Sequence, residues 1–335
     1  PLAGAIAAGN AAVVKPSEWA PATATVVEEI IIEAFAPENV TVIQGEGAQL
    51  VPELIESFRF DHIFYTGSIP VGRAIYSMAA PQLIPVTLEL GGKAPCIVEA
   101  DANIPVAARR ITVGKFTNAG QMCVCPDYLL VHNSIKEELV KEISQCIRNF
   151  YGEAPMESEG YGRIVNKRNF SRLLSFLEQG RIIKGGNYNT DTLSIAPTLI
   201  DELKPDDPIM QEEIFGPLLP VFGFSNKDEA LAIMQAHPNP LSFYVFTSSA
   251  AKEKDWINSL QFGNGCINNT AWQFSNHHLP FGGIGSSGTG AYHGKYSFDL
   301  FTHYKAIMKS PTWFDPSIKY PPLKGKLGLL KRIFR

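Results

Sequence analysis

Residues 62–92, HIFYTGSIPVGRAIYSMAAPQLIPVTLELGG, contain two β-rich runs on either side of a helical one. The runs at 62–68 and 83–90 are typical of strands, and the run at 70–80, which starts with Pro70, is typical of a helix. A strand, a helix and a second strand in this order form a right-handed crossover between parallel strands. The stretch therefore predicts an α/β fold, with a parallel sheet covered by helices.

The same alternation precedes this stretch. Strands are predicted at 11–16 and 39–45, and helices from about Pro21 to Phe35 and at 48–57. Parallel sheets of this kind bind ligands at the carboxyl ends of their strands, where loops meet helix N-termini. We therefore expect the functional residues of this region to lie at those ends.

A second α/β unit is predicted from Glu89 onward. Its helices are expected at 102–116, 135–150 and 171–180, and its strands at 128–132, 196–200, 218–224 and 243–247. The glycine-rich region 279–294 is expected to be an irregular loop, because so many glycines indicate unusual backbone angles or close approach.

The composition is that of a globular protein in water, with 45% hydrophobic and 19% charged residues. A formal net charge of -4 gives no basic field, so nucleic acid is not an expected partner. Five cysteines, an odd number in a long chain, favour a reducing compartment over a disulfide framework. No apolar run reaches the roughly 18 residues that predict a spanning helix.

The two ends have unusual patterns. The chain opens at Pro1 and enters an apolar Gly/Ala segment at once, so we expect an N-terminal truncation. At the other end, basic residues alternate with apolar ones. The basic ones are Lys324, Lys326, Lys331, Arg332 and Arg335, and the apolar ones are Leu327, Leu330, Ile333 and Phe334. This pattern fits either a solvated basic tail or a segment that contacts a membrane surface.

Two strand ends carry candidate ligand-binding residues. Lys15 and Glu18 follow the first strand, where an ammonium and a carboxylate could each bond a ribose hydroxyl; the alternative is a surface turn. Gly67 and Ser68 lie between a strand and a helix that has Pro70 at its second position. Exposed N–H groups at that helix start could bind a pyrophosphate, although the usual G-x-G-x-x-G fingerprint is absent.

Two acidic positions could carry chemistry. Glu89 ends an apolar strand, where partial desolvation would raise its pKa and make it a general base near neutral pH. The alternative is an ordinary carboxylate that faces solvent at a strand end. Glu212 and Glu213 precede an apolar run, and they could contact sugar hydroxyls or merely cap an element.

Cys123 and Cys125 flank a single valine in KFTNAGQMCVCPDY (115–128). A zinc site is disfavoured because no second pair of ligands with the required spacing is present. A redox pair is disfavoured because its usual spacing has two intervening residues. Two interpretations stay open: one cysteine is a nucleophile and the other an inert neighbour, or both are buried thiols without a function.

Taken together, these segments resemble the NAD(P)-dependent aldehyde dehydrogenases. Six motifs occur in that family's order: VVKPSE (13–18), FYTGS (64–68), LELGGK (88–93), FTNAGQMC (116–123), EEIFGP (212–217) and PFGGIGSSGTG (280–290). Within the family the chain most resembles class 3, the fatty-aldehyde branch. CVCPDY (123–128), AYHGKYSF (291–298) and YPPLKGKLGLLKR (320–332) carry this likeness.

The resemblance implies roles for individual residues. Cys123 would be the nucleophile, and Glu89 would activate the water that hydrolyses its thioester. Lys15 and Glu213 would bind cofactor riboses, with Glu18 at the adenosine ribose. Further positions are implied by the same resemblance: Gly67 and Ser68 at the pyrophosphate, Phe215 at the nicotinamide ribose, and Trp272, Phe274 and His277 in a substrate funnel. No metal is implied.

The resemblance also implies how the chain is divided into domains, and which cofactor, substrate, oligomeric state and location to expect. Residues 1–88 would be the C-terminal part of an NAD(P)-binding domain, and 89–275 the catalytic domain. Residues 276–335 would hold the glycine-rich loop, a return to the cofactor and oligomerisation region, and the basic tail. We expect NAD or NADP as cofactor, a medium-chain, long-chain or aromatic aldehyde as substrate, and a homodimer. The expected location is the cytoplasm or the cytosolic face of an internal membrane such as the endoplasmic reticulum.

One departure from the family pattern affects activity. The asparagine that holds the oxyanion in this family lies in a motif upstream of Pro1, and Asn10 does not match it. Because one oxyanion donor contributes about 10²–10³ in rate, we expect this chain to be weakly active or inactive. Two alternatives stay open: a CoA-acylating relative, which would not need Glu89, and a structural or interaction protein.

Overall fold

The computed structural model describes residues 1–333. Contacts divide the chain into two compact units, Pro1–Phe301 and Thr302–Arg335. Arg335 and Phe334, which belong to the predicted basic amphipathic tail, lie outside the described residues.

The N-terminal part of the first unit alternates helices and strands as predicted. Its elements are α1 (Leu2–Ala7), β1 (Ala12–Val14), α2 (Pro21–Ala34), β2 (Val40–Val42), α3 (Gly47–Ser57), β3 (Ile63–Gly67), α4 (Ile69–Ala79) and β4 (Val86–Leu90). The pairs β1–β2 and β3–β4 are both parallel, which confirms the crossovers inferred from the sequence. The two pairs belong to separate sheets among the described residues.

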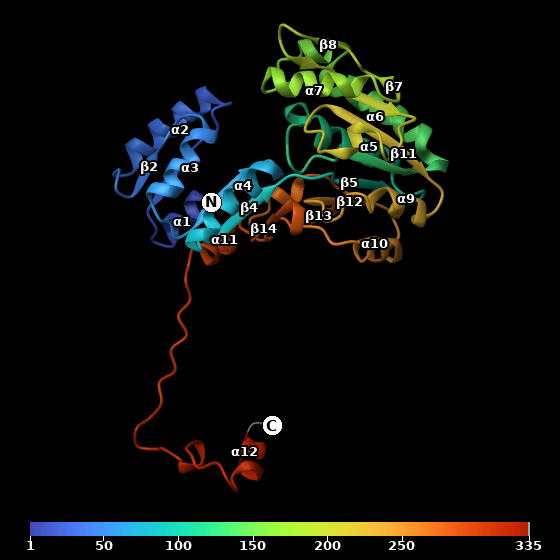
Figure 1. The fold of residues 1–335 in the computed structure, drawn as a ribbon. Helices are drawn as coiled ribbons and strands as arrows, with labels where there is room; N and C mark the ends of the chain where they lie inside the picture. The colour runs from blue at the N-terminus through green and yellow to red at the C-terminus, as the bar shows by residue number, and fades with distance from the viewer. Residues whose placement is uncertain (334–335) are drawn as a thin grey trace. The chain divides into compact units, whose positions relative to one another are not determined.

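The second α/β part is built on one seven-stranded sheet (Figure 1). Its strand order is β13 (Asn264–Ile267), β12 (Ser242–Phe246), β5 (Pro95–Val98), β6 (Tyr128–His132), β11 (Leu218–Phe224), β10 (Thr198–Asp201) and β7 (Arg181–Lys184). Only β7 runs antiparallel to its neighbour. A two-stranded hairpin, β8 (Tyr188–Asn189) and β9 (Ser194–Ile195), lies outside this sheet.

Helices cover both faces of this sheet because its strands are apolar on both sides. Cys96 and Val98 of β5 pack with α5 (Ile104–Phe116) and α6 (Lys136–Tyr151). Ile97 points to the other face and packs with residues of α7 (Lys167–Leu177), α9 (Lys227–Met234) and α10 (Ala250–Ile257). The alternation along β5 follows from the two-residue period of a strand.

The glycine-rich region returns to the first sheet. The prediction of a wholly irregular loop at 279–294 is wrong for β14 (Gly288–Thr289), which pairs antiparallel with β4. Gly288 has φ +149, and a Cβ there would lie 2.2 Å from the Leu88 carbonyl oxygen, so only glycine allows this pairing. The helix α11 (Gly294–Leu300) follows and packs against α1.

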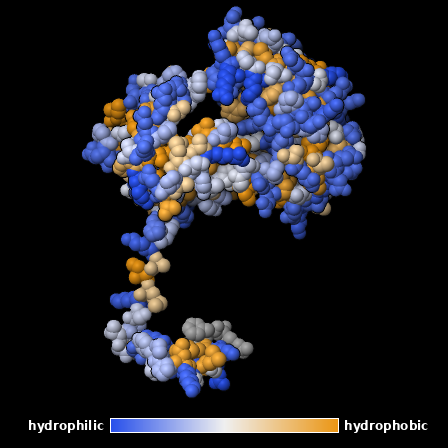
Figure 2. Space-filling view, in the orientation of Figure 1, coloured by the Kyte–Doolittle hydropathy of each residue, from blue (hydrophilic) through white to orange (hydrophobic). Residues whose placement is uncertain are grey.

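The second unit has little regular structure over its described residues. It contains a 3₁₀ turn at Ser317–Lys319 and one short helix, α12 (Leu327–Ile333), where the amphipathic tail was predicted. Leu327 and Leu329 are exposed, and Figure 2 shows hydrophobic surface beside hydrophilic surface on this helix. Within residues 1–333, no helix combines the length and the apolar character needed to cross a bilayer.

Candidate active site

Glu89 lies on β4, between β3 and β14. Its side chain is 3% exposed, and neither carboxyl oxygen has a hydrogen-bond partner among the described residues. Burial raises the pKa of Glu89 to about 8, because a low-dielectric surrounding disfavours the charged form. An unpaired buried carboxyl group with a pKa near neutrality is suited to proton transfer, and the role of general base for Glu89 stays a prediction.

The loop before Cys123 is held by close backbone contacts. Asn118 and Ala119 have left-handed φ values of 51 and 52, and Gly120 follows with φ 74. A Cβ at position 120 would lie 2.2 Å from the Gly216 carbonyl oxygen, so the glycine is required there. The Gln121 amide donates to the Arg163 carbonyl at 2.8 Å and accepts from the Val165 N–H at 2.9 Å. The G-Q pair thus fixes the chain directly before the cysteine.

The two cysteines have different surroundings. Cys123 is partly exposed and packs in a small apolar cluster with Val124, Phe281 and Tyr292. Cys125 is buried, and its thiol points to the Lys115 carbonyl at 3.7 Å. Because a nucleophile must be reached by its substrate, the structure favours Cys123.

The surroundings of Cys123 favour the protonated form of its thiol. Burial is the largest cause that raises its pKa to about 12, and the nearby carboxylates of Glu213 and Glu89 raise it further. These couplings place all three groups in one site. The hydroxyl of Tyr292 belongs to the same site, since Glu89 and Cys123 also raise its pKa, after burial, to about 12.

Glu213 and Phe215 lie in the loop between the short helix α8 (Pro208–Gln211) and β11. Arg172 on α7 donates to the carbonyls of Glu213 at 3.2 Å and Ile214 at 2.7 Å. The Glu213 carboxyl lies on the backbone of Gly91, where a Cβ would be 1.8 Å from Oε2. Burial raises the pKa of Glu213 to about 8, with Asp127 adding to the effect. Glu213 is half-buried, so its carboxyl group lies near the edge of the site.

Lys15 and Glu18 form an ion pair of 2.8 Å after β1. The hydrogen bond from Lys15 is the largest cause that lowers the pKa of Glu18. Glu18 also accepts from the Gly47 N–H at 3.3 Å, at the start of α3. A shallow cavity of about 320 Å³ lies beside this pair, lined by Glu18, Gln44 and Gly45 among others. Lys15 therefore contacts Glu18, whereas Glu213, the other predicted ribose ligand, lies against Gly91.

Gly67 and Ser68 lie at the N-terminus of α4, a helix of 11 residues. Ser68 is the N-cap residue, its side chain caps no N–H, and no acidic residue occupies the first turn. The N–H groups in the first turn of α4 have no side-chain cap, as an anion site requires, and the Tyr65 hydroxyl is hydrogen-bonded to Ser68 at this helix start. A Cβ at position 67 would lie 2.1 Å from the Tyr65 hydroxyl, so the residue must be small.

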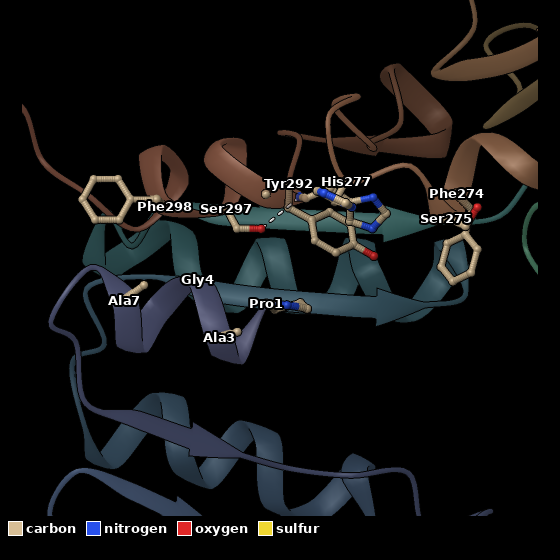
Figure 3. Close-up of a pocket in the computed structure, with 12 residues that line it drawn as sticks. Pro1, Ala3, Gly4, Ala7, Phe274, Ser275, His277, Tyr292, Ser297 and Phe298 are labelled. Atoms are coloured by element: carbon tan, nitrogen blue, oxygen red, sulfur yellow. Dashed lines mark hydrogen bonds between the residues drawn. The ribbon is translucent and has the colours of Figure 1, made fainter.

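A cavity of about 600 Å³ lies between α1, α11 and the segment with Phe274 and His277 (Figure 3). Ala3, Gly4 and Ala7 of α1 line it from one side, and His277 and the α11 residues Ser297 and Phe298 line it from the other. Tyr292 lines this cavity and, like Cys123, packs against the cluster of Val124, Leu241 and Phe281, so this cluster connects the cavity with Cys123. Trp272, the third predicted funnel residue, is 65% exposed and does not line the cavity.

Sequence reasoning missed Tyr292 and His293. His293 has φ 87 and stacks on Phe281, with ring centroids 5.1 Å apart. Both residues belong to the motif AYHG (291–294), which resembles class 3 of the family but by itself predicts no role for them. The packing of Tyr292 against the same cluster as Cys123 depends on a return of the chain that local patterns do not show.

Comparison with known proteins identifies the family. The model of the aldehyde dehydrogenase family matches residues 1–307. The 4,4'-diaponeurosporen-aldehyde dehydrogenase of Staphylococcus aureus (strain NCTC 8325 / PS 47) is 48% identical over 337 residues, which is 100% of this chain and 73% of the relative. This chain belongs to the aldehyde dehydrogenase family.

Two further likenesses place it within the aldehyde dehydrogenases. Aldehyde dehydrogenase family 3 member A2 of Macaca fascicularis is 43% identical over 99% of this chain and 70% of its own length. The solved structure described as the substrate-bound state of Staphylococcus aureus AldH has a TM-score of 0.95 and 47% identity, and covers 100% of this chain and 73% of that one. The predicted class 3 resemblance and the α/β aldehyde dehydrogenase fold are confirmed, and the chain is an oxidoreductase of aldehydes that uses NAD(P).

Proposed function

We propose that this aldehyde dehydrogenase oxidises medium-chain, long-chain or aromatic aldehydes to carboxylic acids through a thioester on Cys123. The observation that supports this most is the placement of a partly exposed thiol near the carboxyl group of Glu89, which has no hydrogen-bond partner among the described residues. The adjoining cavity is large and mostly apolar in its lining, which suits a hydrophobic aldehyde.

The proposed reaction begins at the Cys123 sulfur. The thiol loses its proton, and the sulfur adds to the aldehyde carbonyl to give a thiohemiacetal. Loss of hydride from this carbon leaves a thioester. Glu89, in its ionised form, takes a proton from water, and the resulting hydroxide attacks the thioester carbonyl. The products are a carboxylic acid, a reduced cofactor and the free thiol.

The residues present fit an NAD(P) cofactor. The N-terminus of α4, which has no side-chain cap, would hold the pyrophosphate at Gly67 and Ser68, and the cavity beside Glu18 would take the adenosine. Glu213 and Phe215 would contact the nicotinamide ribose. When bound, the cofactor supplies the hydride acceptor and a positive charge beside the thiol. A nearby positive charge lowers a thiol pKa, which is what Cys123 requires.

The function is tested by product analysis with a series of aldehydes of increasing chain length. We expect reduced cofactor and carboxylic acid in equal amounts, with the highest kcat/KM for the longer or aromatic aldehydes. A single turnover per site is enough to detect both products. The test therefore works even if turnover is slow, with Cys123→Ala as the control. Three results would overturn the proposal: preference for short aldehydes, acyl-CoA as the product when CoA is added, or no saturable binding of NAD(P)⁺.

We also propose that the C-terminal tail contacts an anionic membrane surface. Lys331 and Arg332 lie in the last turn of α12, and Leu327 and Leu329 are exposed on it. Trp313, further upstream, is 86% exposed. Exposed apolar and basic side chains together are typical of segments that lie at a lipid interface.

Sedimentation with phosphatidylserine vesicles tests the tail. Because each basic residue contributes about 1 kcal/mol near an anionic surface, changing Lys331 and Arg332 to serine should weaken binding about tenfold or more. Equal binding to neutral phosphatidylcholine vesicles, or no effect of the substitutions, would overturn the preference for an anionic surface, and no sedimentation with either vesicle would show that the tail is simply solvated.

A further inference from the structure

A buried ion pair lies behind the active site. Lys93 follows the Gly91–Gly92 turn after the strand with Glu89, and Asp127 lies shortly after Cys123. Their side chains form an ion pair and are 3% and 5% exposed. The Asp127 N–H also donates to the Ala94 carbonyl at 2.8 Å, so the two segments are joined by the backbone as well.

The same pair holds a third segment. The Lys93 ammonium donates to the carbonyls of Ile209 and Glu212, each at 3.0 Å. Asp127 Oδ1 accepts from the Ile214 N–H at 3.0 Å. With its bond to Asp127, the ammonium uses all three of its donors. The peptide groups on both sides of Glu213 are therefore fixed by this one pair.

These contacts connect the three functional segments of the site. Lys93 belongs to the segment of Glu89, Asp127 to that of Cys123, and both bind the segment of Glu213. A buried ion pair is weak evidence of stability, because apolar residues of similar volume often stabilise a core equally well. Apolar residues could not bind the carbonyls of Ile209 and Glu212, however. The contribution of the pair is therefore to hold the segment with Glu213 in place.

We propose that the Lys93–Asp127 pair is a positioning element that sets the loop of Glu213 and Phe215 against Cys123 and Glu89. This inference rests on the proposed cofactor role of Glu213. Neither Lys93 nor Asp127 needs to touch substrate or cofactor. Their effect is to keep the Glu213 carboxyl within reach of a bound ligand, where a misplacement of about 1 Å can cost about a hundredfold.

The test compares single and double substitutions. Lys93→Met and Asp127→Asn each leave one buried group unpaired and should lower the melting temperature. The double variant restores neutrality with similar volumes, so its melting temperature should recover towards that of the unaltered chain. Its Kd for NAD⁺ should nevertheless stay raised by about tenfold or more, because the bonds to Ile209 and Glu212 are still missing.

A matched control uses another buried carboxylate. Glu99 accepts from the Trp256 indole N–H at 2.7 Å and from Lys252 at 2.8 Å, and neither partner belongs to the Glu213 loop. Glu99→Gln should lower the melting temperature without changing the Kd for NAD⁺. Recovery of both quantities in the double Lys93/Asp127 variant would show that the pair is merely structural and would overturn the proposal.

Amide hydrogen exchange keeps this inference separate from the proposed function. Exchange of segment 209–215 should be faster in Lys93→Met and in the double variant, and unchanged in Glu99→Gln. If the unaltered chain does not bind NAD⁺, the proposed function fails, and the exchange result still decides whether the pair positions the loop. Unchanged protection of 209–215 in the double variant would overturn the inference.

Discussion

Cys123→Ala should abolish acylation of the protein by an activated fatty ester, with a loss of roughly 10³-fold or more. The reason is that the sulfur of Cys123 forms the covalent bond, and no second group of the site can replace it. An activated ester acylates the thiol without cofactor, so the measurement isolates the nucleophile. The acyl group is detected by intact mass and then located by peptide mapping.

Cys125→Ala is the matched control for this result. Cys125 has a thiol with a pKa raised to about 12, as Cys123 has, yet it is buried and points to a backbone carbonyl. Its removal should leave acylation within about a factor of two, since Cys125 lies outside the site. Loss of acylation in Cys125→Ala with retention in Cys123→Ala would reverse the assignment of the two cysteines.

Glu89→Gln should leave acylation intact and slow hydrolysis of the acyl group by about 10²–10⁴-fold. The amide keeps the shape of the side chain and removes its ability to accept a proton from water. The acylated protein should therefore accumulate, and its decay can be followed by mass spectrometry. Equal decay rates in Glu89→Gln and the unaltered chain would remove Glu89 from the reaction.

The pH dependence of this decay follows from the raised pKa of Glu89. A base with a pKa of about 8 is mostly protonated at lower pH, so hydrolysis should increase about tenfold per pH unit and level off above pH 8. Glu213 also has a pKa raised to about 8, so it could produce a similar profile. Glu213→Gln should keep the pH profile, whereas Glu89→Gln should flatten it.

Much of the fold was predictable because its elements have strong local patterns. The helices at Pro21–Ala34 and Lys136–Tyr151 and the strands at Ile63–Gly67 and Val86–Leu90 lie where periodicity placed them. The pairing of Gly288 and Thr289 with β4 was not predictable, because it joins residues far apart in the sequence through a backbone that only glycine allows.

The candidate site divides in the same way. The positions of Glu89 at a strand end and Cys123 after G-Q were readable from motifs. The ion pair of Lys15 with Glu18 fits their three-residue spacing. The sequence alone did not show that these two side chains bind each other. The roles of Tyr292 and Lys93 depend on contacts between distant segments, and a single sequence does not show which distant residues meet.

The central claim is that Cys123 holds the aldehyde while NAD(P)⁺ accepts its hydride, and that Glu89 then activates the water that hydrolyses the thioester. One single-turnover measurement tests it. Glu89→Gln is incubated with NAD(P)⁺ and a long-chain aldehyde, and the protein is then digested and mapped by mass spectrometry. We expect an acyl adduct on Cys123, equal in mass to the aldehyde less two hydrogens, together with one equivalent of reduced cofactor. Reduced cofactor without an adduct on Cys123, or an adduct on Cys125, would contradict the account.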